Sequence, residues 1–452
     1  MSKKVCIIGA GPSGMSLLGN LKREGLEVTC YEKQERPGGL WNFSWRTGTD
    51  GHGENVHCSQ YQHLFSNGPK ECLEIPEYTF SEHFGREIPS FPPRPVLEDY
   101  LRGYWRFLGI EEEKDVLTDH CVRGVTFDEK EEKFTVRVTN LVEDEEFEET
   151  FDYLCVATGH FSVPNVPEFP GMRKFPGRIL HSHDFRSARE FAGKNVVVVG
   201  GSYSAEDIAL QCHKFGADSV TITYRTAAMG FKWPENVKEL PLLQTIEGKT
   251  CSFKDGSRVE VDAIILCTGY KHHFPFMPPE LRLRTANIYN LPNLYRDLQW
   301  HATTGGARDC AGKLFYVGMQ DQFYTFTMFE AQARWVAGVI GGKVELPPVE
   351  ERKREIKKWL ETNKDLNDCY KQIRAQTEYV QRLAKEAKYD VDLNVEDLFV
   401  EWEHDKHVDI LTYRDKSFIS KFSGNKAPLC GSPWIDNYDD DVEKFISNIK
   451  IE

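Results

Sequence analysis

The chain has 452 residues, 40% of them hydrophobic, and a formal net charge of −14. This length predicts about two to three domains, and the negative charge argues against nucleic-acid binding. The twelve cysteines contain no C-x-x-C pair, which indicates a reducing compartment and offers neither a redox dithiol nor a metal site. The acidic run at 439–441 is expected to be a solvated surface. No apolar run reaches the ~18 residues of a membrane span, so we expect a cytoplasmic protein without a membrane partner.

The first predicted element is a buried strand that runs into a glycine-rich turn. Residues 5–8 are apolar and lead into GAGPSG, which has G-x-G-x-x-G spacing and is followed by helical periodicity. The first glycine permits a tight turn, the second lets a pyrophosphate approach the backbone, and the third allows close helix packing. Free N–H groups at the start of the helix then hold the phosphates. The sequence predicts a dinucleotide site formed by Gly9, Gly11, Pro12, Ser13 and Gly14.

The next predicted strand, residues 27–31, ends in Glu32, eighteen residues after Gly14. A carboxylate at this distance accepts hydrogen bonds from the ribose of an adenine dinucleotide. Residues 36–42 contain a glycine pair followed by tryptophan, which predicts a loop laid along the same cofactor. We therefore expect the cofactor to be bordered by Glu32, Lys33, Gln34, Gly39, Leu40 and Trp41.

A second nucleotide site is predicted beyond a proline-rich connector at residues 163–170. Residues 195–200 form an apolar strand that runs into Gly200, Ser202 and Ala205 at the three key positions of the turn. The following strand ends in Arg225, where an acid would select NAD. An arginine suits the 2′-phosphate of NADP instead.

The order of the elements predicts an insertion. A helix is expected up to about Phe107, an antiparallel sheet over 122–151, and buried strands at 153–159 and 261–269 that both end in Thr-Gly. The strand at 313–318, followed by a helix over 326–341, is expected to rejoin the first unit. We predict an α/β fold of two Rossmann-like domains with a helical C-terminal segment: residues 1–168 and 276–452 bind FAD, and the inserted residues 169–275 bind NADP.

Two dinucleotides in one chain suggest that they exchange electrons. NADPH would pass hydride to FAD, and the next acceptor is left open by the motifs. A disulfide reductase would need a C-x-x-C beside the flavin, whereas a simple reductase needs no further residue. A monooxygenase would react reduced flavin with O₂ to form a C4a-hydroperoxide and would have to exclude water from it.

The segment FPGRILHSHDF at 175–185 fits F-x-G-x-x-x-H-x-x-x-F. This pattern resembles the fingerprint of flavin-containing monooxygenases. Segments such as SNGPKECLE, GSYSAEDIA and GMQDQFYTFTMF are similar to those of the bacterial trimethylamine monooxygenases within that family. The resemblance covers nearly the whole chain and implies FAD, NADPH, O₂ and a tertiary-amine substrate that leaves as an N-oxide.

The resemblance also implies roles for individual residues. Asn67, which the residues alone identify only as a turn asparagine, matches the amide that contacts NADP⁺ and the oxygenated flavin, and Gln320 matches a flavin contact. His181 and Phe185 of the fingerprint are expected to link the domains. The implied NADP contacts are Asn67, Gly200, Ser202, Tyr203, Ser204, Arg225 and Thr226, with Asn67 and Tyr203 as the catalytic pair.

The substrate is the least determined feature. Phe323 and Tyr324 are predicted to form an aromatic wall that holds an amine, with ordinary core packing as the alternative. Residues 300–312 are expected to form a long flexible loop at the substrate entrance. Trimethylamine, a larger alkaloid amine or a sulfur compound all fit. Baeyer–Villiger oxygenation and a non-enzymatic NADPH sensor remain alternatives, and the oligomeric state, including a homo-oligomer, is left open.

Overall fold

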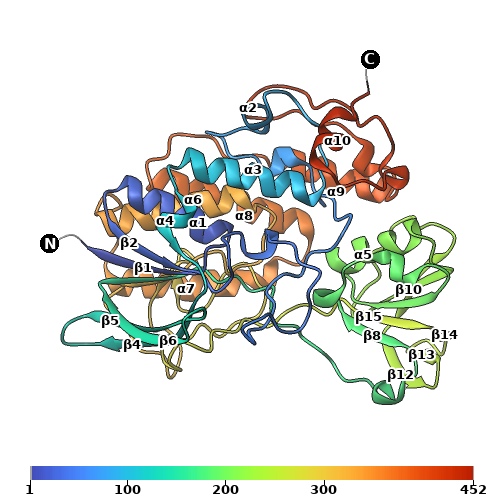
Figure 1. The fold of residues 1–452 in the computed structure, drawn as a ribbon, viewed down its shortest axis with the longest axis horizontal. Coiled ribbons are helices and arrows are strands. Elements are labelled where there is room, and N and C mark those ends of the chain that lie inside the picture. The colour runs from blue at the N-terminus through green and yellow to red at the C-terminus, as the bar shows by residue number, and fades with distance from the viewer. Residues whose placement is uncertain (1–2, 451–452) are drawn as a thin grey trace.

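The computed structural model describes residues 3–450. Figure 1 shows two α/β units side by side, the larger one at the left. The larger unit is built on a seven-stranded sheet. In spatial order its strands are β16 (Leu294–Tyr295), β17 (Gln299–Trp300), β18 (Leu314–Tyr316), β7 (Tyr153–Val156), β1 (Lys4–Ile8), β2 (Glu27–Tyr31) and β3 (Val116–Leu117).

The strands from β18 to β3 are parallel. β1 and β2 are joined by a helical crossover over Pro12–Arg23, as parallel neighbours require. An antiparallel sheet follows β3, close to the predicted range. Its strands are β4 (His120–Asp128), β5 (Lys133–Asn140) and β6 (Glu145–Phe151).

The smaller unit is an insertion, which confirms the predicted fold class. Its parallel five-stranded sheet has the order β11 (Val237–Pro241), β10 (Ser219–Tyr224), β9 (Asn195–Val199), β15 (Ala263–Leu266) and β8 (Arg178–His181). A small antiparallel sheet covers it, made of β12 (Leu243–Glu247), β13 (Thr250–Phe253) and β14 (Arg258–Glu260). The chain returns to the first sheet at β16, earlier than the sequence predicts, and β18 then joins that sheet as expected. The domain limits 168 and 275 stay a prediction.

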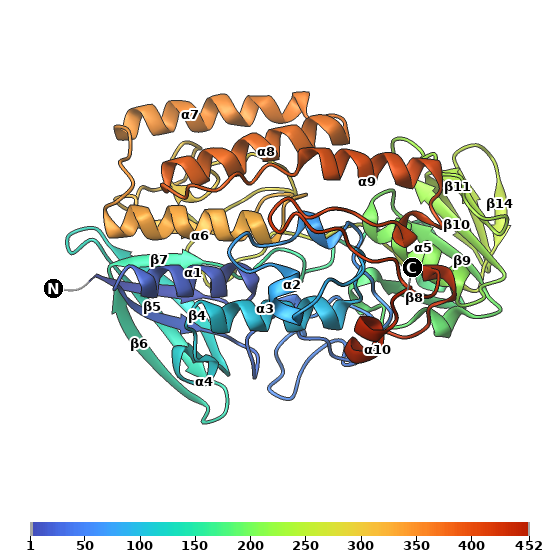
Figure 2. The ribbon, with the colours of Figure 1, turned by 90° about the horizontal axis from the view of Figure 1, so that it is seen from above.

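Helices cover the larger sheet. Helix α6 begins and ends where the sequence predicts and packs along α1. Figure 2 shows α6, α7 and α8 running along the larger unit, and α9 reaching toward the inserted one. The helices are α1 (Pro12–Arg23), α2 (Phe80–Phe84), α3 (Arg94–Phe107), α4 (Glu112–Asp115), α5 (Tyr203–Lys214), α6 (Phe326–Gly341), α7 (Val349–Thr362), α8 (Cys369–Glu386), α9 (Glu396–Val408) and α10 (Val442–Ser447). None of the helices within the described range is long and apolar enough to cross a membrane.

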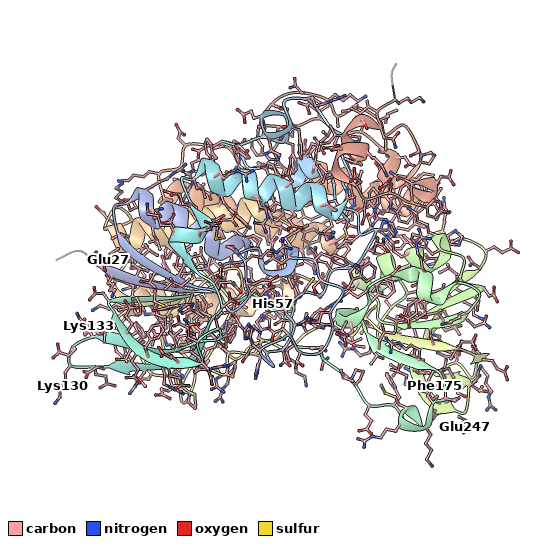
Figure 3. The ribbon with its side chains drawn as sticks, in the orientation of Figure 1. Glu27, His57, Lys130, Lys133, Phe175 and Glu247 are labelled. Carbon is pink, nitrogen blue, oxygen red and sulfur yellow. The ribbon has the colours of Figure 1, made fainter. Side chains whose placement is uncertain are left out.

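The expectation that residues 300–312 shape the substrate entrance is wrong. They precede β18, so they lie at the amino edge of the parallel sheet, whereas the glycine turns follow its carboxyl edge. Arg308 pairs with Glu129 at 3.3 Å, in the turn between β4 and β5. Figure 3 labels Lys130 and Lys133 of that hairpin at the far left, well away from His57 near the centre.

Four histidines lie close to the two connections between the units. His160 and His272 lie in the connections, His181 ends β8, and His57 Nε2 would lie 4.0 Å from a Cβ on Gly159. His160 stacks on His272 with ring centroids 4.6 Å apart, and His181 Nε2 lies 3.1 Å from the carbonyl oxygen of Gly269. Phe185 is fully buried against Tyr61. Burial lowers the pKa of His160 to about 3 and that of His181 to about 4.

Acid should therefore destabilise this junction. A histidine whose folded pKa lies below its unfolded value of about 6.5 binds its proton first in the unfolded state, so stability falls as the pH drops from 6.5 toward 4. For His160 we expect a loss of about 2 kcal/mol between pH 6.5 and 5. Thermal unfolding of the His160→Gln variant should show a shallower pH dependence than the parent, and identical slopes would contradict this.

Candidate dinucleotide and substrate site

The turn after β1 has the geometry that a dinucleotide needs. Gly9 has φ +99°, and a Cβ on Gly14 would lie 2.0 Å from the carbonyl oxygen of Gly9, so neither position accepts a side chain. No side chain caps α1, whose N-cap is Gly11, so the first N–H groups of the helix remain for a ligand. Ser13 lies against Gly318, just after β18, where an added Cβ would be 3.1 Å from the Ser13 hydroxyl oxygen.

Glu32 follows β2 beside this turn. Its Oε2 accepts a hydrogen bond from the N–H of Ala10 at 2.7 Å, and its Oε1 accepts from the N–H of Gln34 at 2.8 Å. The carboxyl is buried, which raises its pKa. These bonds hold the carboxylate at the position where a ribose would meet it.

The loop at 36–42 lies over the same turn. The N–H of Gly38 donates to the Ala10 carbonyl oxygen at 2.9 Å, and a Cβ on Gly39 would be 3.0 Å from the Gly11 Cα. Trp41 meets the ring of Phe326 at the start of α6 with centroids 5.5 Å apart. The structure thus gathers most of the predicted FAD residues around one space.

Three other predicted FAD residues have hydrogen-bond partners outside the turn after β1. Lys33 Nζ donates to the Asn55 carbonyl oxygen, and Leu40 is half-buried beside Cys58. Gln320 is buried, and its Oε1 accepts from Gln332 Nε2 at 2.8 Å. Gln332 Oε1 in turn accepts from the N–H of Gly318, so Gln320 is fixed behind the turn.

The second turn repeats the arrangement in the inserted unit. Gly200 has φ +152°, and a Cβ there would lie 2.3 Å from the Cys267 carbonyl oxygen. Ser202 is the N-cap of α5 and makes no side-chain capping bond. Ser202 and Ser204 are both exposed, which leaves this turn open to a nucleotide.

Arg225 and Thr226 follow β10 next to that turn, because a Cβ on Gly201 would lie 3.5 Å from the Tyr224 Cβ. Both residues are exposed. Arg225 forms no ion pair among the residues that the structure describes, so its guanidinium is available for an anion.

Replacing Arg225 by aspartate should weaken NADPH binding by about 10- to 100-fold, because one charge-assisted contact with the 2′-phosphate is lost. NADH lacks this phosphate, so its KM should change far less. Steady-state kinetics with both cofactors measure the effect. The exposed Arg284 offers a matched control, and an equal loss for NADPH and NADH would refute the phosphate contact.

Tyr203 begins α5 and reaches across to the larger unit. Its hydroxyl donates to Glu403 Oε1 at 2.7 Å, and its ring stacks on Trp402 with centroids 5.8 Å apart. The Phe323 ring meets it edge-on at 6.3 Å. Lys406 lies 4.6 Å from the Tyr203 ring centre and pairs with the buried Glu206 at 2.9 Å.

Asn67 is held by a second buried network. Arg414 Nη2 donates to Asn67 Oδ1 at 3.3 Å and to Asp207 Oδ1 on α5 at 2.6 Å. Tyr61 also donates to Asp207. Because the Asn67 amide oxygen accepts from Arg414, its Nδ2 group is turned the other way, and it has no partner among the described residues.

Sequence reasoning missed the C-terminal residues of these two networks. Trp402, Glu403, Lys406 and Arg414 carry no local motif, and α9 has too little amphipathic periodicity to single them out. Trp402 packs on the loop after Asn67, since a Cβ on Gly68 would lie 3.7 Å from its ring. We call this stretch, residues 396–415, the C-terminal strap.

The two predicted substrate-wall residues are placed differently. Phe323 faces Tyr203 and Trp402. Tyr324 is fully buried, and its hydroxyl is bonded to Thr377 Oγ1 at 2.8 Å and to the N–H of Val395 at 3.1 Å. This placement favours the core alternative for Tyr324.

Comparison with known proteins decides the family. The flavin-binding monooxygenase-like family matches residues 2–232 and 235–401. The chain belongs to this family. It is 50% identical to a trimethylamine monooxygenase of Methylocella silvestris over 98% of both chains, and 48% identical to one of Pelagibacter ubique over 98% of this chain and 99% of the other.

Solved structures of related enzymes resemble this chain over most of its length. A crystal structure of Tmm from Pelagibacter sp. strain HTCC7211 matches with a TM-score of 0.93 and 47% identity, covering 98% of this chain and all of the other. An S-allyl-L-cysteine S-oxygenase from Allium sativum matches with a TM-score of 0.78 and 27% identity, covering 92% and 95%. Cyclohexanone monooxygenase, at 14% identity, shares the fold alone.

The chain is thus a flavin-dependent monooxygenase that uses FAD and NADPH, and its two turns fit these cofactors. Each turn has a glycine that no other residue could replace and a helix start without a side-chain cap. The buried Thr158 hydroxyl, next to Ala157 against the first turn, has no partner within residues 3–450. No cluster of side chains able to hold a metal ion occurs in that same range.

Proposed function

We propose that this flavin-binding monooxygenase oxygenates the nitrogen of a small tertiary amine, with trimethylamine as its first substrate. The observation that carries the proposal is 50% identity, over nearly the full length of both chains, to a protein named for that activity. The match covers 98% of both chains and therefore spans both α/β units. The dependence on a reduced nucleotide and the free cysteines are consistent with a cytoplasmic enzyme.

Bound FAD, reduced by NADPH, supplies the oxygen-activating chemistry. We assign the protein four tasks around it. The turns at Gly9 and Gly200 bind the two pyrophosphates, and Glu32 orients the FAD ribose. Asn67 donates a hydrogen bond from Nδ2 into the site, since Arg414 occupies its amide oxygen. Such a preorganised donor stabilises developing negative charge.

We assign the fourth task to Tyr203, which forms part of the wall of the proposed substrate site. Its hydroxyl is engaged by Glu403, and burial raises its pKa far above the physiological range, so it is not a proton acceptor at neutral pH. With Phe323 and Trp402 it forms an aromatic surface that excludes water and packs well against methylated nitrogen. Asp321, partly buried two residues before Phe323, is a candidate counter-charge for an ammonium group.

The test is turnover by the FAD-loaded protein. With NADPH, trimethylamine and ¹⁸O₂, we expect amine-stimulated NADPH oxidation and an N-oxide that carries one labelled oxygen, measured by mass spectrometry. Protein that fails to take up FAD, or that oxidises NADPH without forming any N-oxide across a panel of tertiary amines, would refute the proposal.

S-oxygenation is a second candidate, supported by the 27% identity to an S-oxygenase over 92% of this chain. Thioethers, like tertiary amines, offer a lone pair to an electrophilic oxygen. A competition assay between trimethylamine and dimethyl sulfide, with both oxides measured, decides which is preferred. Baeyer–Villiger oxygenation has only fold-level support.

A further inference from the structure

A cavity of about 240 Å³ lies between α7, α8 and the turn that joins β16 to β17. It is far larger than the ~10–15 Å³ that one water needs. Its wall includes the aromatic rings of Tyr289, Tyr295, Trp359 and Tyr379. Gln320 also lines it, two residues after Gly318, which packs against Ser13 of the dinucleotide turn, so the cavity lies close to the proposed flavin site.

A carboxylate that forms no ion pair within residues 3–450 faces this cavity. Asp297 lines it and is only 7% exposed. Its Oδ1 accepts from the N–H of Leu291 at 2.6 Å, whereas its Oδ2 has no hydrogen-bond partner among residues 3–450. Burial raises the pKa of this carboxyl to about 7. A charge in such a place is stabilised only by an opposite charge close by.

The charges of the two arginines in the wall act to lower the pKa of Asp297, but within residues 3–450 neither arginine forms an ion pair with it. Arg296 pairs with Glu355 and, at 2.9 Å, with Glu386. Arg382 lies 3.9 Å from Glu355 and covers the Trp359 ring at 4.3 Å. Glu378 adds a further acid to the rim. The lining thus holds two acids and two arginines, but both arginines are engaged by glutamates outside it, which leaves the buried Asp297 as the lining charge that a cation could pair with.

We propose that this cavity binds a small alkylammonium ion, with the Asp297 carboxylate as its counter-ion. The aromatic rings would pack against the alkyl groups of such an ion and attract its charge. The choice of an alkylammonium rests on the proposed function, because a tertiary amine is mostly protonated near neutral pH. The cavity then holds substrate next to the site that oxidises it, separated from it by Gln320.

The test uses a cation that cannot be oxygenated. Tetramethylarsonium, soaked into crystals of the FAD-loaded enzyme, should give an anomalous peak against Asp297 Oδ2. Calorimetry with tetramethylammonium should show binding that weakens about tenfold or more in Asp297→Asn. Asparagine keeps the acceptor for the Leu291 N–H and tolerates the φ of +54°, so only the charge changes.

Two further variants sharpen the result. Ala375→Leu adds bulk from α8 into the cavity and should also abolish the anomalous peak. Asp365→Asn removes an exposed charge one residue from the cavity wall and should leave binding unchanged. If Asp297→Asn does not fold, the anomalous peak in the parent enzyme and its loss in Ala375→Leu still test whether the cavity binds the cation.

The outcomes separate the two proposals. An enzyme that forms N-oxide but shows no peak at Asp297, or binds equally well as Asp297→Asn, would overturn the cation site alone. A peak at Asp297 in an enzyme that forms no N-oxide would retain the site and overturn the proposed function. A peak only beside Phe323 would place the cation at the oxidation site and also overturn this inference.

Discussion

Asn67→Ala should retain FAD and NADPH oxidation but lose N-oxide formation by about 100-fold or more, because loss of one preorganised donor at a charged centre has effects of this size. Asn67 lies on the loop that packs against Trp402, and its amide oxygen accepts a hydrogen bond from Arg414. The substitution therefore leaves both nucleotide turns intact. Reducing equivalents that no longer reach the amine should appear as hydrogen peroxide.

The measurement is the ratio of N-oxide formed to NADPH consumed, with the flavin spectrum as a check on loading. Asn55→Ala, at an exposed asparagine, is the matched control and should keep the parent ratio. A normal ratio in Asn67→Ala would remove Asn67 from the proposed mechanism. Loss of bound flavin instead would show that its role is structural.

The parts of the site that could be predicted are those in which backbone geometry dictates the residue. At Gly14 a Cβ would fall 2.0 Å from a carbonyl oxygen, and at Gly200 the φ of +152° suits glycine, so both turns are visible as motifs. Glu32 follows from them because its distance along the chain is set by one helix and one strand. The same reasoning located the second turn and placed β18 in the first sheet.

The remaining features depend on contacts between distant segments. Arg414 meets Asn67 across 347 positions of the chain, and Tyr203 meets Glu403 across 200, so no local spacing could reveal either pair. The entrance assigned to residues 300–312 was wrong because a glycine pair indicates a loop but not the sheet edge at which it lies. Similarly, Asp440 accepts a hydrogen bond from the N–H of His63, so its acidic run is not merely a solvated surface.

Arg414 and Asp207 should be strongly coupled. Arg414 is only 4% exposed and Asp207 only 1%, and their side chains are 2.6 Å apart. The single substitution Arg414→Met or Asp207→Leu leaves the other charge buried without its partner. Each should lower the free energy of unfolding by about 3–5 kcal/mol. The double substitution removes both charges and should cost clearly less than the sum of the two, although it leaves the Tyr61 hydroxyl without its acceptor.

Denaturant unfolding of the four proteins gives this coupling energy, and the exposed pair Arg173–Glu168 provides a control cycle that should give under about 1 kcal/mol. Additive costs at Arg414 and Asp207 would show that the pair does not hold the units together. The same variants test the strap's role in the site, since Arg414→Met also releases the Asn67 amide. Where the double variant refolds but still consumes NADPH without forming N-oxide, Arg414 acts by positioning Asn67 and not through stability alone.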